Sequence, residues 1–194
     1  MPDYDASTAV IVVDLQNDFA DGDGSLYVPG GEETVAVANE HIERALASGG
    51  RIFYTQDWHP ERTPHFATDG GVWPVHCVRD TWGAQLQPAL RLEGSVVRKG
   101  ANGEDGYSGF TMRDPETGET RPTELDALLQ EAAAERLVIL GLATDYCVKA
   151  TALDAAGLGY QTTVIRDGIR AVDLEPGDGQ RAIEAMREAG VIIV

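Results

Sequence analysis

Short apolar runs separated by amphipathic segments form the basic pattern of the chain. Residues 8–13 (TAVIVV) are an uninterrupted, β-branched run that ends at Asp14. Such a run is typical of a strand that is buried on both faces of a parallel sheet. Five further runs predict strands at residues 51–55, 95–98, 136–142, 160–165 and 191–194.

The segments between these runs have helical spacing. One apolar stripe covers residues 35–46 and ends at two glycines, as helices commonly do. A further helix is predicted at residues 122–133, where a proline stands at the first position. Two more are predicted at residues 144–156 and 178–189, and each of these is followed by a glycine. Strands alternating with helices predict a doubly wound α/β fold. We expect a mainly parallel six-stranded sheet with helices on both faces, a Rossmann-like three-layer arrangement, in one domain over residues 1–194.

Two long segments interrupt this alternation. Residues 57–88 are rich in Pro, Gly, His and Trp, and residues 100–121 are polar and contain several glycines. Loops of this length inside a domain usually carry function. Both follow a predicted strand, so both are expected at the carboxyl edge of the sheet, where open α/β folds bind ligands.

Charge and composition narrow the classes of partner. The 194 residues include 32 acidic and 15 basic side chains, a net charge of −17, and the acids are spread along the whole chain. Neither nucleic acid nor an anionic membrane is therefore expected as a partner. No apolar run approaches the roughly 20 residues of a membrane span, and the polar, acidic start does not resemble a signal peptide. We expect a cytoplasmic protein whose two cysteines are thiols.

Three reactive groups follow the predicted strands. Asp14 ends the first, Lys99 follows the third, and Cys147 comes shortly after the fourth. Lys99 is one of only two lysines among the fifteen basic residues. Cys147 falls in the first turn of a predicted helix capped by Thr144 or Asp145, a position where backbone N–H groups favour a thiolate.

These three groups suit nucleophilic catalysis. A thiol nucleophile needs a base, and Asp14 can serve if burial raises its pKa, while Lys99 can hold the carboxylate and stabilise the thiolate. The structural alternatives are a packed cysteine, an aspartate that caps a turn and a solvated lysine. Because parallel strands end at one edge, we favour the catalytic interpretation.

A second cluster lies in the loop after the second predicted strand. Asp57 and His59 are two residues apart, which places both side chains on one face of an extended backbone, and loop closure can bring His65 and His76 to them. One carboxylate with two or three imidazoles suits zinc, manganese or iron(II). The alternative is a proline-rich loop whose histidines cap and pack. By contrast, His41 is expected to be exposed on the first helix.

Aromatic residues complete the candidate site. Phe19, Trp73 and Tyr107 fall in loops at the same edge and can sandwich a flat ring, with loop packing as the alternative. Cys77 is expected to be a packed thiol.

Six separated motifs occur in order from the first predicted strand to the third predicted helix. They are Asp14-Leu15-Gln16-Asn17-Asp18-Phe19, Asp57-Trp58-His59-Pro60 with His65, Trp73-Pro74-Val75-His76-Cys77, Lys99-Gly100, Tyr107-Ser108-Gly109-Phe110 and Gly141-Leu142-Ala143-Thr144-Asp145-Tyr146-Cys147-Val148. Together they resemble the nicotinamidase branch of the isochorismatase-like cysteine hydrolases. The metal cluster distinguishes this branch from relatives that lack it.

The resemblance implies a role for each group. Cys147 would be the nucleophile, Asp14 the general base and acid, and Lys99 its charged partner. A cis peptide is implied between Leu142 and Ala143, and the N–H groups of Ala143 and Cys147 would form an oxyanion hole.

The resemblance also implies a metal and a substrate. One divalent ion, with zinc ahead of iron and manganese, would be held by Asp57, His59 and His76, with His65 near or bound. The ion would orient the pyridine nitrogen of nicotinamide, without generating the nucleophile. Four aromatic residues would surround the ring: Phe19, Trp73, Tyr107 and Tyr146.

The expected activity is hydrolysis of nicotinamide to nicotinate and ammonia through a cysteine thioester, in NAD salvage, with pyrazinamide as a further substrate. The nearest alternative is an isochorismatase-like amidase acting on a different small amide. Two others are a hydrolase whose metal generates hydroxide, and a binding protein without catalytic activity. The sequence does not favour a monomer over a homo-oligomer.

Overall fold

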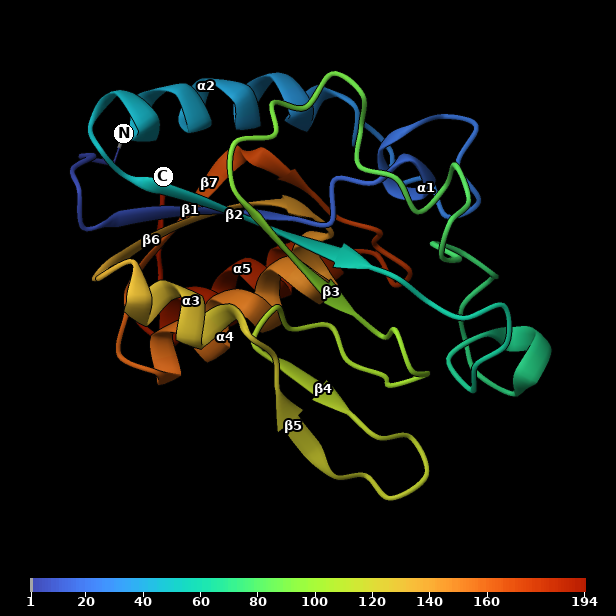
Figure 1. Cartoon of the computed structure of the whole chain (residues 1–194). Coiled ribbons are helices and arrows are strands. Elements are labelled where there is room, and N and C mark those ends of the chain that lie inside the picture. Colours follow the sequence, from blue (N-terminus) through green and yellow to red (C-terminus); the bar gives the residue numbers. More distant parts are fainter. Residues whose placement is uncertain (1) are drawn as a thin grey trace.

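A parallel sheet lies at the centre of the computed structural model, which describes residues 2–194 (Figure 1). Within these residues the sheet has six strands, and every neighbouring pair is parallel. In spatial order they are β3 (Ser95–Lys99), β2 (Arg51–Asp57), β1 (Thr8–Val13), β6 (Arg136–Leu142), β7 (Gln161–Arg170) and β8 (Ile192–Ile193). The predicted fold class is confirmed.

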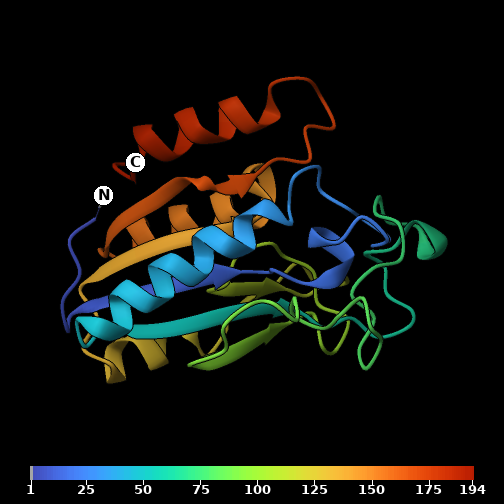
Figure 2. The ribbon, with the colours of Figure 1, turned by 90° about the horizontal axis from the view of Figure 1, so that it is seen from above.

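Helices cover both faces of this sheet because alternate residues of the central strands point to opposite sides. Val10 and Val12 of β1 pack on the side of α2 (Glu33–Ala47), which lies over the middle of the sheet in Figure 2. Ala9 and Ile11 pack in a second apolar cluster. Its helices are α3 (Leu125–Glu131), α4 (Lys149–Gly157) and α5 (Asp178–Glu188).

The strand order creates a crevice between β1 and β6. These two strands are neighbours in space, and the chain order runs outward from them in both directions, to β2 and β3 on one side and to β7 and β8 on the other. Ligands of doubly wound folds bind at the carboxyl ends of the strands at such a switch point. The segments after β1, β2 and β3 gather at this end, including α1 (Asn17–Ala20) and the 3₁₀ turn η1 (Ala67–Asp69).

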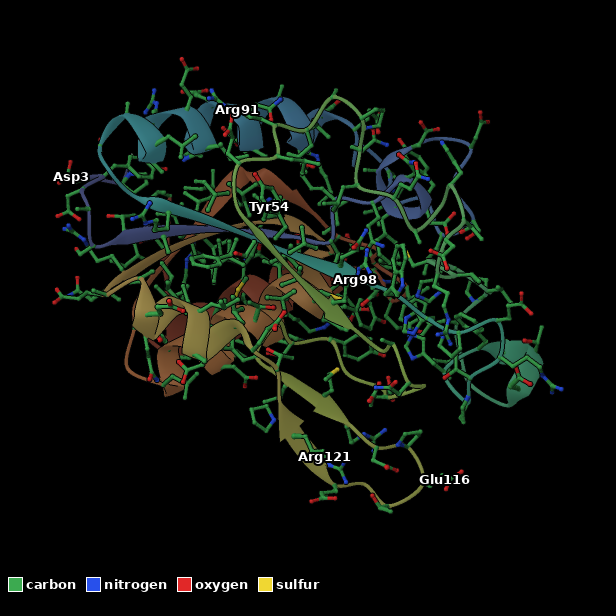
Figure 3. All side chains as sticks on the ribbon, viewed as in Figure 1. Asp3, Tyr54, Arg91, Arg98, Glu116 and Arg121 are labelled. Carbon is green, nitrogen blue, oxygen red and sulfur yellow. The ribbon has the colours of Figure 1, made fainter. Side chains whose placement is uncertain are left out.

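The segment at residues 100–121 is not wholly irregular. Strands β4 (Thr111–Arg113) and β5 (Thr120–Pro122) form an antiparallel hairpin that carries Glu116 and Arg121 away from the sheet (Figure 3). The expected helix at residues 122–133 therefore begins later, at Leu125, because Pro122 belongs to β5. The hairpin was missed because its residues are largely exposed and polar, so they lack apolar alternation.

Two further expectations about helices need correction. The segment predicted as one helix from residue 144 begins as a π-helical turn, Thr144–Val148, and continues as α4. His41 is not exposed but buried, and its Nδ1 is hydrogen-bonded to the hydroxyl of Tyr4. The amino-terminal segment therefore covers this side of α2, which the apolar pattern of the helix alone did not indicate.

Residues 2–194 contain no helix with the length and apolar character needed to cross a lipid bilayer.

Gly141 allows close contact between the two central strands. Its φ is +122°, and a Cβ atom there would lie 2.1 Å from the carbonyl oxygen of Val13 in β1. We predict that Gly141→Ala lowers the free energy of unfolding by about 1–3 kcal/mol, through backbone strain and overpacking. Gly157→Ala is the matched control, because a Cβ atom at Gly157 meets nothing within 4 Å. Urea unfolding of both variants tests this, and equal midpoints would contradict it.

Candidate active site

The ends of β1 and β3 and the turn after β6 bring three reactive groups together. The Nζ atom of Lys99 lies 2.9 Å from Oδ2 of Asp14 and 3.6 Å from Sγ of Cys147. All three side chains are buried, with Asp14 0%, Lys99 1% and Cys147 7% exposed. The three residues predicted from the strand ends therefore lie in one buried cluster.

Asp14 is held at the end of β1 by its neighbour β2. The hydroxyl of Thr55 donates a hydrogen bond of 2.6 Å to Oδ1 of Asp14, and the Asp14 N–H donates to the Thr55 carbonyl. Asp14 adopts a φ of +48°, at the point where the chain leaves the strand. The Thr55 bond leaves Oδ2 directed toward Lys99. Sequence reasoning missed Thr55, because a threonine within an apolar strand carries no distinctive signal.

Burial and charge together determine the protonation of this cluster. Burial works to lower the pKa of Lys99, but the carboxylates of Asp14 and Asp57 raise it well above its usual value. Burial raises the pKa of Asp14, although Lys99 partly opposes this. Burial likewise raises the pKa of the Cys147 thiol well above its usual value, against the effect of Lys99. Burial therefore opposes the thiolate that the helix start was expected to favour.

The turn that presents Cys147 is built differently from the expected capped helix. Ala143 occupies the cap position and no side chain caps the turn. Asp145 instead accepts hydrogen bonds from the N–H groups of Val172 and Asp173, at 3.0 and 2.8 Å, which fastens the turn to the segment after β7. The peptide between Leu142 and Ala143 is cis, as the resemblance implied.

Three histidines form a second cluster beside the first. Ring nitrogens of His59, His65 and His76 lie within 4.8 Å of one another, and all three side chains are buried. The Nδ1 atom of His76 lies 2.7 Å from the carbonyl of Pro74, which can only accept, so its Nε2 is free to bind an ion. Burial lowers the pKa of His76 to about 4, so this imidazole is neutral at pH 7.

His59 shows most directly that the cluster fits a metal ion. Both of its ring nitrogens are buried without a hydrogen-bond partner in the described chain. Unpaired buried nitrogens are unfavourable unless an ion or water satisfies them, and three imidazoles are suitable ligands for a divalent transition metal. Gly100 makes room for the ring, because a Cβ atom there would lie 2.6 Å from Nδ1 of His59.

Asp57 lies between the two clusters. Its Oδ1 is 2.6 Å from Nζ of Lys99, and its Oδ2 is 3.8 Å from Nε2 of His59. Burial works to raise the pKa of this carboxyl group, but Lys99 and His59 hold it well below its usual range. Asp57 is therefore a carboxylate that faces both the lysine and the histidines.

Gln16, which sequence reasoning missed as a site residue, fixes the backbone of Asp57. Its Nε2 donates to the Asp57 carbonyl at 2.7 Å, and its Oε1 accepts from the Asp57 N–H at 2.8 Å. Gln16 is 0% exposed. The sequence did offer a signal: Gln16 comes two residues after Asp14, at the end of a buried strand, and a buried side-chain amide there needs hydrogen-bond partners.

An aromatic pocket opens over Cys147. Phe19, Trp73, Tyr107 and Tyr146 all line it, as predicted. The indole N–H of Trp73 donates to the Tyr107 hydroxyl at 3.0 Å, and Trp73 meets Tyr146 edge to face with ring centroids 4.8 Å apart. These contacts hold the rings in a fixed arrangement.

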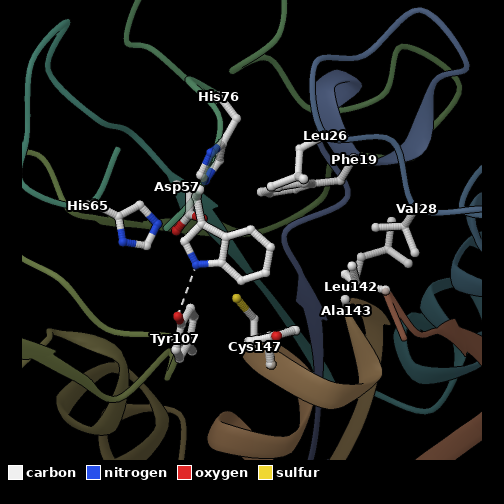
Figure 4. A pocket seen from close by; sticks show the side chains of 13 residues that line it. Phe19, Leu26, Val28, Asp57, His65, His76, Tyr107, Leu142, Ala143 and Cys147 are labelled. Carbon is white, nitrogen blue, oxygen red and sulfur yellow. Dashed lines mark hydrogen bonds between the residues drawn. The ribbon is translucent and has the colours of Figure 1, made fainter. Parts of the chain in front are cut away.

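The pocket has a polar end and an apolar end, with Cys147 between them (Figure 4). Asp57, His65 and His76 form the polar end. Sequence reasoning missed the apolar end, because its members lie in irregular segments or, like Leu142, at the end of a predicted strand. They are Leu26, Val28, Leu142 and Val172. The geometry suits a small flat molecule with a metal-binding atom at one edge and an electrophilic carbon near Cys147.

Known proteins share this arrangement of elements. The isochorismatase domain matches residues 8–194. The chain is 41% identical to the nicotinamidase of Escherichia coli, over 95% of this chain and 93% of that protein. Its structure resembles the pyrazinamidase of Pyrococcus horikoshii in complex with zinc, with a TM-score of 0.85 and 38% identity over 97% of this chain and 98% of that one.

A third relative was solved with a ligand. The yeast nicotinamidase bound to the inhibitor nicotinaldehyde has a TM-score of 0.84 and 32% identity, over 96% of this chain and 99% of that one. The six motifs, the fold and these matches agree. The chain belongs to the isochorismatase family.

Proposed function

We propose that this chain is a nicotinamidase, an amidohydrolase that converts nicotinamide to nicotinate and ammonia. The main support is the buried cluster of Asp14, Lys99 and Cys147, which lies at an aromatic pocket beside the three-histidine cluster. The likeness to the nicotinamidases of E. coli and yeast supports this substrate. Pyrazinamide keeps the ring nitrogen and the carboxamide, so we propose it as a second substrate.

The pocket would bind the substrate by its flat ring. Phe19 and Trp73 flank the ring, and Tyr107 and Tyr146 close the pocket around it. The ring nitrogen faces the histidines, and this orientation brings the carboxamide carbon to Sγ of Cys147. Binding of this kind turns attack on the carbonyl into a reaction between fixed neighbours.

Asp14 would move the protons of the reaction. It takes the proton of the Cys147 thiol, and Sγ then forms a bond to the carboxamide carbon while the carbonyl electrons move to oxygen. The N–H groups of Ala143 and Cys147 stabilise that oxyanion. Asp14 returns the proton to the amide nitrogen, and the C–N bond breaks to release ammonia.

The second half of the cycle repeats these roles with water. Asp14 takes a proton from water, and the oxygen attacks the thioester carbon. As the C–S bond breaks, Asp14 returns that proton to Sγ, which restores the thiol, and the acid loses its own proton to solvent and leaves as nicotinate. Lys99 stays charged because the Asp57 carboxylate faces it throughout, and the second negative charge beside it lies on Asp14 or, when Asp14 is protonated, on Cys147 or the oxygen of the intermediate. Its charge stabilises the thiolate when it forms.

The proposed metal ligands are His59, His65 and His76, together with Asp57. The zinc complex of the P. horikoshii relative favours zinc, with iron and manganese as alternatives. When bound, a divalent ion supplies a Lewis-acid contact for the ring nitrogen. We further propose a role in NAD salvage, a single domain over residues 1–194, and a cytoplasmic location in keeping with two free thiols.

Replacement of the nucleophile tests the mechanism. Cys147→Ala is expected to lower kcat for ammonia release from nicotinamide by at least about 10³-fold, because Cys147 lines the pocket and Cys77, the second free thiol, does not. Cys77→Ala is the matched control. The Cys77 thiol is also buried, and the backbone N–H of Cys77, which donates to Oδ2 of Asp18, is kept in the variant. The Cys77 variant should therefore keep the wild-type kcat. Substantial turnover by the Cys147 variant with metal retained would favour a metal-generated hydroxide instead.

Removal of a metal ligand tests ring recognition. His59→Ala is expected to be purified with less metal and to have a KM for nicotinamide raised about 10-fold or more, since the ring loses its partner. Chelation of the wild-type protein should have the same effect, and added zinc should rescue the wild type but not the variant. Wild-type KM in the His59 variant would argue against contact between the ring and the ion.

The substrate itself is tested with a panel of small amides. Hydrolysis of a different amide with nicotinamide left intact would overturn the substrate proposal.

A further inference from the structure

Asp105 belongs to neither the triad nor the pocket lining, yet it contacts the histidine cluster directly. Its Oδ1 lies 2.9 Å from Nδ1 of His65, and its Oδ2 lies 3.0 Å from Nη2 of Arg113. Arg113 is the last residue of β4. One carboxylate therefore links the polar end of the pocket to the β4–β5 hairpin.

The backbone holds Asp105 in this position. Its N–H donates to the Arg113 carbonyl at 2.7 Å, and the Arg113 N–H donates to the Asp105 carbonyl at 2.5 Å. The N–H of Gly106 donates to the same Oδ1 that faces His65, at 2.8 Å. The carboxylate of Asp105 is thus held by contacts with His65, Gly106 and Arg113.

This carboxylate determines which nitrogen of His65 can bind an ion. A carboxylate only accepts hydrogen bonds, so Nδ1 carries the proton and the lone pair of the neutral ring lies on Nε2. The His65 ring stacks on that of His59, with centroids 4.9 Å apart at an interplanar angle of 24°, and lies 5.4 Å from that of His76. The free nitrogen of His65 is therefore part of the three-histidine cluster.

We propose that Asp105 is a positioning residue that orients His65 as a direct ligand of the divalent ion. The β4–β5 hairpin holds Asp105 in this position through Arg113. Partners of this kind fix the tautomer and orientation of ligating histidines and increase their basicity. The inference rests on the proposed metal site of the nicotinamidase function. It assigns a role to a hairpin that otherwise extends away from the sheet.

The test is metal affinity in the absence of substrate. Zinc affinity is measured by competition with a chromophoric chelator, and the ligand set is followed by the visible spectrum of the cobalt(II) protein. Asp105→Ala is expected to weaken zinc binding about 10- to 100-fold and to change the cobalt spectrum. Asp105→Asn keeps the shape and one acceptor, and should weaken binding less.

Glu104→Gln is the matched control. It removes the same charge from the adjacent residue, but within residues 2–194 the hydrogen bonds to the Glu104 carboxylate come from the backbone N–H and the side-chain amide of Asn102, in the same loop. Its zinc affinity and cobalt spectrum should equal those of the wild type. Equal losses in the Glu104 and Asp105 variants would overturn the inference, because long-range charge would then explain both.

Two further outcomes separate this inference from the proposed function. Wild-type zinc affinity and an unchanged cobalt spectrum in Asp105→Asn and Asp105→Ala would overturn the role of Asp105 and leave the nicotinamidase proposal intact. A wild-type protein that binds neither zinc nor cobalt would overturn the metal site and the inference together. Thermal unfolding of the metal-free variants shows whether any loss of affinity reflects loss of the fold, and the Asn variant decides the test if the Ala variant does not fold.

Discussion

One ammonium group between two buried carboxylates is the interaction on which this site depends. Lys99 is 1% exposed, and its Nζ atom lies 2.9 Å from Oδ2 of Asp14 and 2.6 Å from Oδ1 of Asp57. Removing one partner of a buried ion pair typically costs about 3–5 kcal/mol, because it leaves a charge without compensation. Strands β1, β2 and β3 must therefore end at the same level in the sheet, and their parallel register provides this.

The ammonium group of Lys99 also connects the proposed chemistry at Cys147 to the proposed recognition of the substrate ring. In our mechanism Asp14 exchanges protons with Cys147. Asp57 faces His59, and Lys99 contacts both carboxylates. Burial keeps Cys147 a thiol at rest, so in our mechanism the thiolate forms only when Asp14 accepts the proton in the closed pocket. An enzyme built in this way would limit unwanted reactions of a free thiolate with solvent or oxidants.

The sequence predicted the sheet and the reactive groups well, because both depend on strong local patterns. Apolar, β-branched runs predicted the six strands, and the residues that follow the first four predicted strands indicated which side chains meet. The β4–β5 hairpin lacked such a pattern, since exposed polar residues can pair without apolar alternation. His41 was wrongly expected to be exposed because the contact with Tyr4 is non-local. The helix start was expected to favour a thiolate at Cys147, but burial raises the pKa of this thiol, and burial appears only in the folded chain.

The central claim is that Cys147 carries the acyl group during turnover. It is tested most directly by mixing the enzyme with nicotinamide, quenching rapidly with acid and analysing the digested protein by mass spectrometry. We expect a nicotinoyl group on the peptide that contains Cys147, formed and lost on the timescale of turnover, with the peptide of Cys77 unmodified. Release of nicotinate with Cys147 unmodified at every quench time would contradict it.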